Sequence, residues 1–139
     1  MADTHRWDVL LAVAMGGALG SLARYGLGLA LPHPPGGLAV ATLLGNVLGC
    51  LALGALMTAL ARTTDPPRLL RPFLGVGVLG GFTTFSTYVL DAVEAARLGH
   101  AGIAVVYAVG SVVASLVAVA VGMGVTHAAL RRSAARRVS

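Results

Sequence analysis

A cluster of small polar residues interrupts the third apolar segment of this chain. Residues 80–88 read GGFTTFSTY, so four hydroxyl residues, two glycines and three aromatic rings fall within nine positions. Hydroxyl groups donate hydrogen bonds, and the edge of an aromatic ring carries partial positive charge. These groups are suited to holding an ion.

The same residues weaken a helix at this point. Gly80 and Gly81 add backbone freedom, and the hydroxyls of Thr83 and Thr84 compete for backbone carbonyls. A helix break at membrane depth is tolerated only where protein, water or an ion satisfies the freed backbone groups. Free carbonyls favour a cation, whereas free N–H groups and hydroxyls favour an anion.

A second polar set lies in the fourth apolar segment. Tyr107, Ser111 and Ser115 are spaced four residues apart, which places them on one face of a helix. Such hydroxyls either bond to their own helix and to neighbouring helices, or they form a polar stripe that passes a small hydrogen-bond acceptor along the membrane. The spacing leaves both alternatives open.

The residue types argue against an enzyme or a clustered metal site. His5, His33, His100 and His127 lie at segment ends or in loops, and the acidic residues lie at membrane edges without a central nucleophile beside them. The single Cys50 lies in an apolar run and is read as a packing residue. Other polar groups inside the apolar segments include Arg24, Thr42, Asn46 and Asp91.

The elements that must position these groups are membrane helices. The chain is 57% hydrophobic and 11% charged, whereas soluble domains carry about 25% charged residues. We therefore predict a single all-α membrane domain over residues 1–139, with the third helix broken in mid-membrane. Each predicted span is long enough to cross a bilayer, and the spans cover residues 9–31, 38–61, 72–96 and 101–130.

Small residues favour close helix packing within this domain. Gly16 and Gly20 form one G-x-x-x-G pair, and Gly45 and Gly49 form another. All ten basic residues are arginines, and they are dispersed among apolar segments rather than gathered on one water-facing surface. This dispersion argues against nucleic-acid binding.

The whole chain resembles the Fluc-type (CrcB) family of small dimeric fluoride channels. The resemblance rests on GGALGSLARYGLG at 16–28, TLLGN at 42–46, GGFTTFSTY at 80–88 and the stripe at 107, 111 and 115. It implies an antiparallel, dual-topology dimer with two pores, and a structural Na⁺ held at the dimer centre by the backbone carbonyls of Gly80 and Thr83.

The resemblance also assigns side chains to the fluoride pathway. Arg24 matches the first-span arginine of the family, and Asp91 matches an acidic vestibule position. Tyr88 stands where the family usually has Phe, which keeps a ring edge but adds a hydroxyl. The pathway residues are expected to be Asn46, Thr84, Phe85, Ser86, Thr87, Tyr88, Tyr107, Ser111 and Ser115.

The function implied is passive fluoride export through the plasma membrane. Two alternatives remain open at this point. A small transporter of the multidrug-resistance type needs a central carboxylate, but Asp91 and Glu94 lie near the end of the third span. A non-transporting assembly subunit explains the glycines but not the clustered hydroxyls.

The arginines are unevenly divided between the two sides of the membrane. With four spans, one side carries at most two arginines, Arg97 and Arg24, while the other carries eight: Arg6, Arg62, Arg68, Arg71, Arg131, Arg132, Arg136 and Arg137. The side with eight arginines, which includes both termini, is expected to be cytoplasmic. An antiparallel homodimer, by contrast, favours nearly balanced flanking charge.

This bias predicts that the chain inserts in one orientation and pairs with an oppositely oriented paralogue. Cysteine-accessibility labelling of both termini in cells is the measurement. The chain expressed alone should label from one side only, and labelling from both sides would contradict the heterodimer.

Overall fold

The computed structural model describes the backbone of residues 4–138 and the side chains of residues 6–135. The side chains of His5, Arg136 and Arg137 therefore lie outside the described residues. Within the described part, every regular element is helical. The elements in chain order are α1 (Thr4–Ala30), α2 (Val40–Ala61), η1 (Arg71–Leu79), α3 (Gly80–Phe82), α4 (Ser86–Arg97) and α5 (Ala101–Val138).

Four helical spans are long and apolar enough to cross a membrane, as predicted. They cover Arg6–Ala30, Val40–Ala61, Arg71–Arg97 and Ala101–Ala135. The chain is therefore a multi-pass membrane protein. The third span is composite, because η1, α3 and α4 follow one another within it and residues 83–85 lie outside any helix.

The first part of the third span is a π-helix, which the sequence did not predict. Residues 71–79 form the π-helix η1, with Pro72 in its first turn, where its missing N–H costs no helical bond. π-helical turns are rare and usually occupy a single turn. The sequence pattern offered no signal for a π-helix of nine residues.

Glycines bring the helix backbones close together. A Cβ added to Gly77 of η1 would lie 2.9 Å from the Cα of Gly16 on α1, and one added to Gly81 would lie 3.1 Å from the Cα of Gly17. The predicted small-residue face of α1 therefore packs on the third span. Gly49 of the other predicted pair faces the side chain of Thr83.

The second helix pair is α2 with α5, and it uses the same device. A Cβ on Gly54 would press on the Val119 carbonyl of α5, and a Cβ on Gly122 would press on the Leu51 carbonyl of α2. Close backbone approach favours helix association in lipid, where apolar burial gives no preference for protein over lipid tails.

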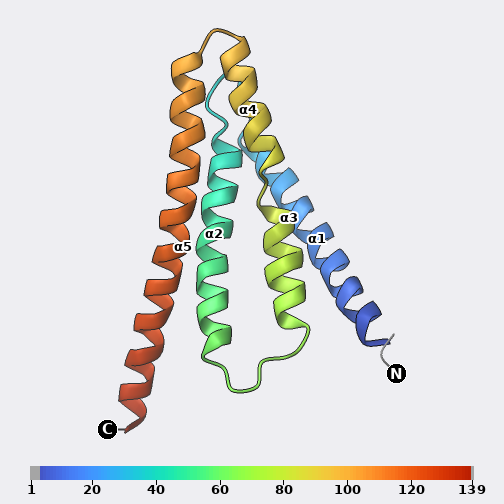
Figure 1. The fold of residues 1–139 in the computed structure, drawn as a ribbon, viewed down its shortest axis with the longest axis vertical. Helices are drawn as coiled ribbons and strands as arrows, with labels where there is room; N and C mark the ends of the chain where they lie inside the picture. The colour runs from blue at the N-terminus through green and yellow to red at the C-terminus, as the bar shows by residue number, and fades with distance from the viewer. Residues whose placement is uncertain (1–3, 139) are drawn as a thin grey trace.

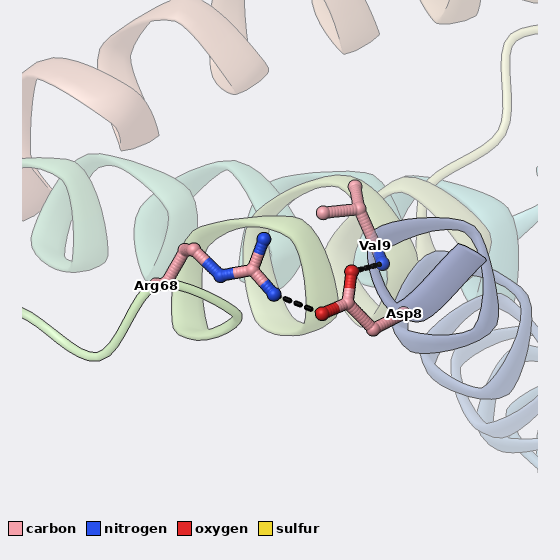
Figure 2. A network of polar contacts seen from close by, with 3 residues as sticks. All are labelled: Asp8, Val9 and Arg68. Atoms are coloured by element: carbon pink, nitrogen blue, oxygen red, sulfur yellow. Dashed lines mark hydrogen bonds and ion pairs between the residues drawn. The ribbon is translucent and has the colours of Figure 1, made fainter. Parts of the chain in front are cut away.

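The chain ends and loops divide between two sides. Figure 1 shows both termini and the α2–η1 loop at one end, and the α1–α2 and α4–α5 loops at the other. Two polar contacts tie the first end together. Arg68 forms an ion pair with Asp8, which also accepts a bond from the Val9 amide (Figure 2), and Arg62 donates to Nδ1 of His127 at 2.8 Å.

The α2–α5 contact gives a matched test of glycine packing. Gly122→Ala should lower the free energy of unfolding, because overpacking against a backbone that cannot move aside costs about 1–3 kcal/mol. Gly124→Ala, two residues along the same helix, meets nothing within 4 Å and should leave stability unchanged or slightly raised. Thermal unfolding in detergent would measure both, and equal stability of the two variants would contradict this packing.

Candidate functional site

The third span breaks at Thr83. This residue has extended backbone angles, with φ −79° and ψ 156°. Its amide and its hydroxyl both donate to the Leu79 carbonyl, each at 3.0 Å. The chain therefore leaves α3 with its last turn closed and starts α4 in a new direction.

Asn46 on α2 holds the broken segment from the side. Its Nδ2 group donates to the Thr84 carbonyl at 2.9 Å, and its Oδ1 accepts from the Thr84 amide at 2.8 Å. In an unbroken helix the Thr84 amide would instead donate to the Gly80 carbonyl, four residues earlier. The Asn46 side chain thus replaces a helical bond and leaves the Gly80 carbonyl without that donor.

The Thr84 side chain does the same for the next carbonyl. Its Oγ1 accepts from the Thr87 amide at 3.2 Å, in the manner of a helix cap. In a continuous helix that amide would donate to the Thr83 carbonyl. The Thr84 hydroxyl also donates to Thr87 Oγ1 at 3.1 Å and lies 3.3 Å from Ser86 Oγ, so three predicted hydroxyls form one cluster.

A cleft of about 470 Å³ lies against the break. It brings together most of the predicted pathway residues from α2, the third span and α5. Ser86, Thr87 and Tyr107 do not line it. The lining residues are Asn46, Cys50, Gly80, Thr83, Thr84, Phe85, Tyr88, Ser111, Val112, Ser115 and Leu116.

Ser111 carries a hydroxyl without a partner inside this cleft. The residue is 4% exposed, and among buried side-chain atoms of the described residues its Oγ is the one without a hydrogen bond. Ser133, by comparison, bonds back to the Ala129 carbonyl of its own helix. An unpaired buried hydroxyl is costly, so at Ser111 the structure favours the ligand-binding alternative over back-bonding.

The aromatic rings form a ladder beside the cleft. The ring centroids of Phe85 and Tyr88 are 5.5 Å apart, and those of Tyr88 and Tyr107 are 5.8 Å apart, with tilted planes in both pairs. The Tyr88 hydroxyl donates to the Ala108 carbonyl of α5 at 2.8 Å. The extra hydroxyl at this position is therefore bound to backbone.

Tyr107 makes the reciprocal contact between the same helices. Its hydroxyl donates to Oδ2 of Asp91 on α4 at 3.2 Å, and the Thr42 side chain lies within hydrogen-bonding reach of it. Tyr107 thus bonds to a neighbouring helix, which is the first of the two alternatives for the polar residues of the fourth span. Asp91 is held by this contact outside the cleft.

Arg24 lies on the other side of the break. Its Nε donates to the Gly81 carbonyl at 3.2 Å. A smaller pocket of about 220 Å³ there is lined by Arg24, Tyr25, Gly28, Leu29, Ala41, Thr42, Thr84 and Thr87. Thr84 lines both hollows, so this pocket and the cleft meet at Thr84.

Two contributors escaped sequence reasoning. Cys50, expected from the sequence to be a packing residue, lines the cleft one helical turn after Asn46. Its position four residues after Asn46 could have indicated this, because residues four apart share a helix face. The contact of Tyr88 with the Ala108 carbonyl joins residues 20 apart and had no local signal.

Comparisons with known proteins identify the family of this chain. A family model described as CrcB-like protein, Camphor Resistance (CrcB), matches residues 11–123. This chain belongs to the CrcB family. It is 49% identical over 131 residues to the Fluoride-specific ion channel FluC 2 of Thermobifida fusca, covering 94% of this chain and 97% of that protein.

Further curated relatives are similar over most of their length. The Fluoride-specific ion channel FluC 2 of Nocardia farcinica is 46% identical, with 93% of this chain and 91% of that protein covered. The Fluoride-specific ion channel FluC of Paracoccus denitrificans is also 46% identical, with 83% and 91% covered. The sequence resemblance to the CrcB family is thereby confirmed.

The bound state of the Tyr88 hydroxyl gives a prediction. Tyr88→Phe should keep ion flux within about twofold of wild type, because the hydroxyl is turned away to Ala108 and the ring edge remains. It should lower thermal stability by the loss of one hydrogen bond, about 1 kcal/mol. Liposome flux and thermal unfolding measure the two effects. A Tyr88→Phe flux lowered tenfold would show that the hydroxyl acts on the ion.

Proposed function

We propose that this protein is a fluoride-selective channel that lets fluoride leave the cell passively. The main support is the cleft beside the helix break. It is lined by the polar side chains of Asn46, Ser111 and Ser115 and by the aromatic rings of Phe85 and Tyr88. The curated relatives named above are fluoride-specific ion channels, which places the chain among channels rather than enzymes. Its expected location is the plasma membrane, as a multi-pass protein.

The donors in the cleft suit a small, strongly hydrated anion. Fluoride must exchange its water shell for close donors, and charge-assisted hydrogen bonds are the strongest available. Asn46 uses one N–H of its amide on Thr84, which leaves the second for an anion. The unpaired Ser111 hydroxyl is a further donor, and aromatic ring edges face an anion without supplying a proton.

We further propose that two copies close the cleft between them. Phe85 is 76% exposed and lines the cleft together with the polar side chains of Asn46 and Ser111. An exposed ring beside such a hollow is suited to contact with another subunit. An antiparallel homodimer is one arrangement, and a heterodimer with an oppositely oriented paralogue is the other, which the uneven arginines favour.

The backbone at the break fits a structural Na⁺. The amides that would satisfy the Gly80 and Thr83 carbonyls in a helix donate instead to Asn46 and Thr84. Oxygen ligands of this kind are what a hard cation requires, and a cation there would offset carbonyl dipoles and favour anions nearby. We propose that these two carbonyls of each subunit hold the ion.

The two alternatives are less well supported. Asp91, a carboxylate that a proton-coupled transporter would need at its centre, is bonded to Tyr107 and does not line the cleft. A subunit with only an assembly role would have no reason to leave a buried Ser111 hydroxyl unpaired in a cleft that Asn46 and Ser115 also line.

Fluoride efflux from proteoliposomes tests the channel proposal. Purified protein should release fluoride, read with a fluoride electrode, and retain chloride in matched vesicles. The protein should be tested alone and with an oppositely oriented paralogue. Absence of fluoride efflux in both preparations would contradict the channel proposal and favour a non-transporting assembly subunit.

Two variants test the pathway assignment. Phe85→Ile removes the ring edge, and Asn46→Asp removes the amide donor and adds a repelling charge. Either change should suppress fluoride flux by tenfold or more while size-exclusion chromatography still shows the assembled dimer. Wild-type flux in an assembled variant would remove that residue from the pathway.

A further inference from the structure

The Asn46 side chain holds the broken segment through both the nitrogen and the oxygen of its amide, and we call this pair of bonds to the Thr84 backbone the clamp. Asn46 and Thr84 are 38 residues apart, and they exchange two short hydrogen bonds. Among the described residues of α2, Asn46 is the one whose side chain is hydrogen-bonded to the broken segment. The two bonds resemble those between neighbouring β-strands, with the Asn46 amide in place of the second strand's backbone.

The two diverted amides match the two proposed cation ligands one for one. Asn46 takes the Thr84 amide, whose helical acceptor would be the Gly80 carbonyl. The Thr84 hydroxyl takes the Thr87 amide, whose helical acceptor would be the Thr83 carbonyl. Without these two acceptors the helix would be free to continue and would reclaim both carbonyls.

We propose that Asn46 and Thr84 are positioning residues for the structural Na⁺, in addition to any contact they make with fluoride. Asn46 keeps the Gly80 carbonyl available, and Thr84 keeps the Thr83 carbonyl available. This inference rests on the sodium site in the proposed function. It makes one amide side chain responsible both for an N–H in the anion cleft and for the shape of the cation site.

Coupling between the two ions follows from the shared clamp. A movement of Asn46 that shortens its reach to an anion also shifts Thr84, and with it the availability of the Gly80 carbonyl. Coupling of binding free energies is reciprocal. Fluoride should therefore change sodium affinity in wild type, and this effect should disappear when the clamp is removed.

Sodium binding to the purified, sodium-free protein is the test, read as ²²Na⁺ binding and as sodium-dependent thermal stabilisation. Asn46→Leu removes both clamp bonds while keeping a branched side chain with the same number of heavy atoms, and it should weaken sodium binding at least tenfold. Thr84→Val removes the cap on the Thr87 amide but keeps the backbone bonds to Asn46. It should weaken sodium binding by a smaller factor, about threefold to tenfold.

Ser115→Ala is the matched control. Ser115 lines the same cleft and has no part in the clamp, so sodium affinity should stay at the wild-type value even where fluoride flux changes. Wild-type sodium affinity in Asn46→Leu, or in Thr84→Val should the former fail to fold, would overturn the inference. If Asn46→Leu and Ser115→Ala both weakened sodium binding by the same factor, the inference would be overturned as well.

The outcome is separable from that of the channel proposal. Sodium binding that depends on Asn46, in a protein without fluoride efflux, would support the clamp and remove the channel. Fluoride efflux together with sodium binding that is indifferent to Asn46 and Thr84 would support the channel and remove the clamp.

Discussion

The paired hydrogen bonds between Asn46 and Thr84 are the contact on which the site depends. A backbone group left unsatisfied in hydrocarbon costs several kcal/mol, so the third span breaks only because side chains replace its lost helical bonds. Asn46 supplies an acceptor and a donor, and the Thr84 hydroxyl supplies a second acceptor. The break is thus a set of exchanged bonds, and the carbonyls it releases become available to a ligand.

The rest of the fold brings these groups to one depth. Glycines let α1 lie against the third span and α2 lie against α5, which carries Asn46 and Ser111 to the same cleft. Two tyrosines then join α4 to α5 in opposite directions, because Tyr88 donates to Ala108 and Tyr107 donates to Asp91. These contacts hold α4 against α5 after the third span has lost its helical continuity.

Much of this was visible in the sequence. Apolar length predicted four spans, and the Gly-Gly-Phe-Thr-Thr run predicted a break in the third. The structure moves the break slightly, since Gly80 and Gly81 are helical and Thr83 is extended. Helix weakness was a local property and therefore predictable, whereas the exact turn depended on a partner 38 residues away.

What the sequence did not predict was set by tertiary contacts. The spacing of Tyr107, Ser111 and Ser115 left two alternatives, and only the packed structure showed that Ser111 lacks a partner while Tyr107 bonds across helices. Ser86 and Thr87 were expected in the pathway but bond to Thr84 outside the cleft. The nine-residue π-helix has no sequence signal that we recognise.

The central claim is that the Gly80 carbonyl is free of a helical bond, and isotope-edited infrared spectroscopy tests it most directly. A single ¹³C=¹⁸O label at Gly80, in sodium-free lipid, should give an amide I band at higher wavenumber than the same label at Gly77, whose carbonyl accepts the Gly80 amide. Coincident bands for the two labels would show a helix that continues through Gly80, and would contradict the account.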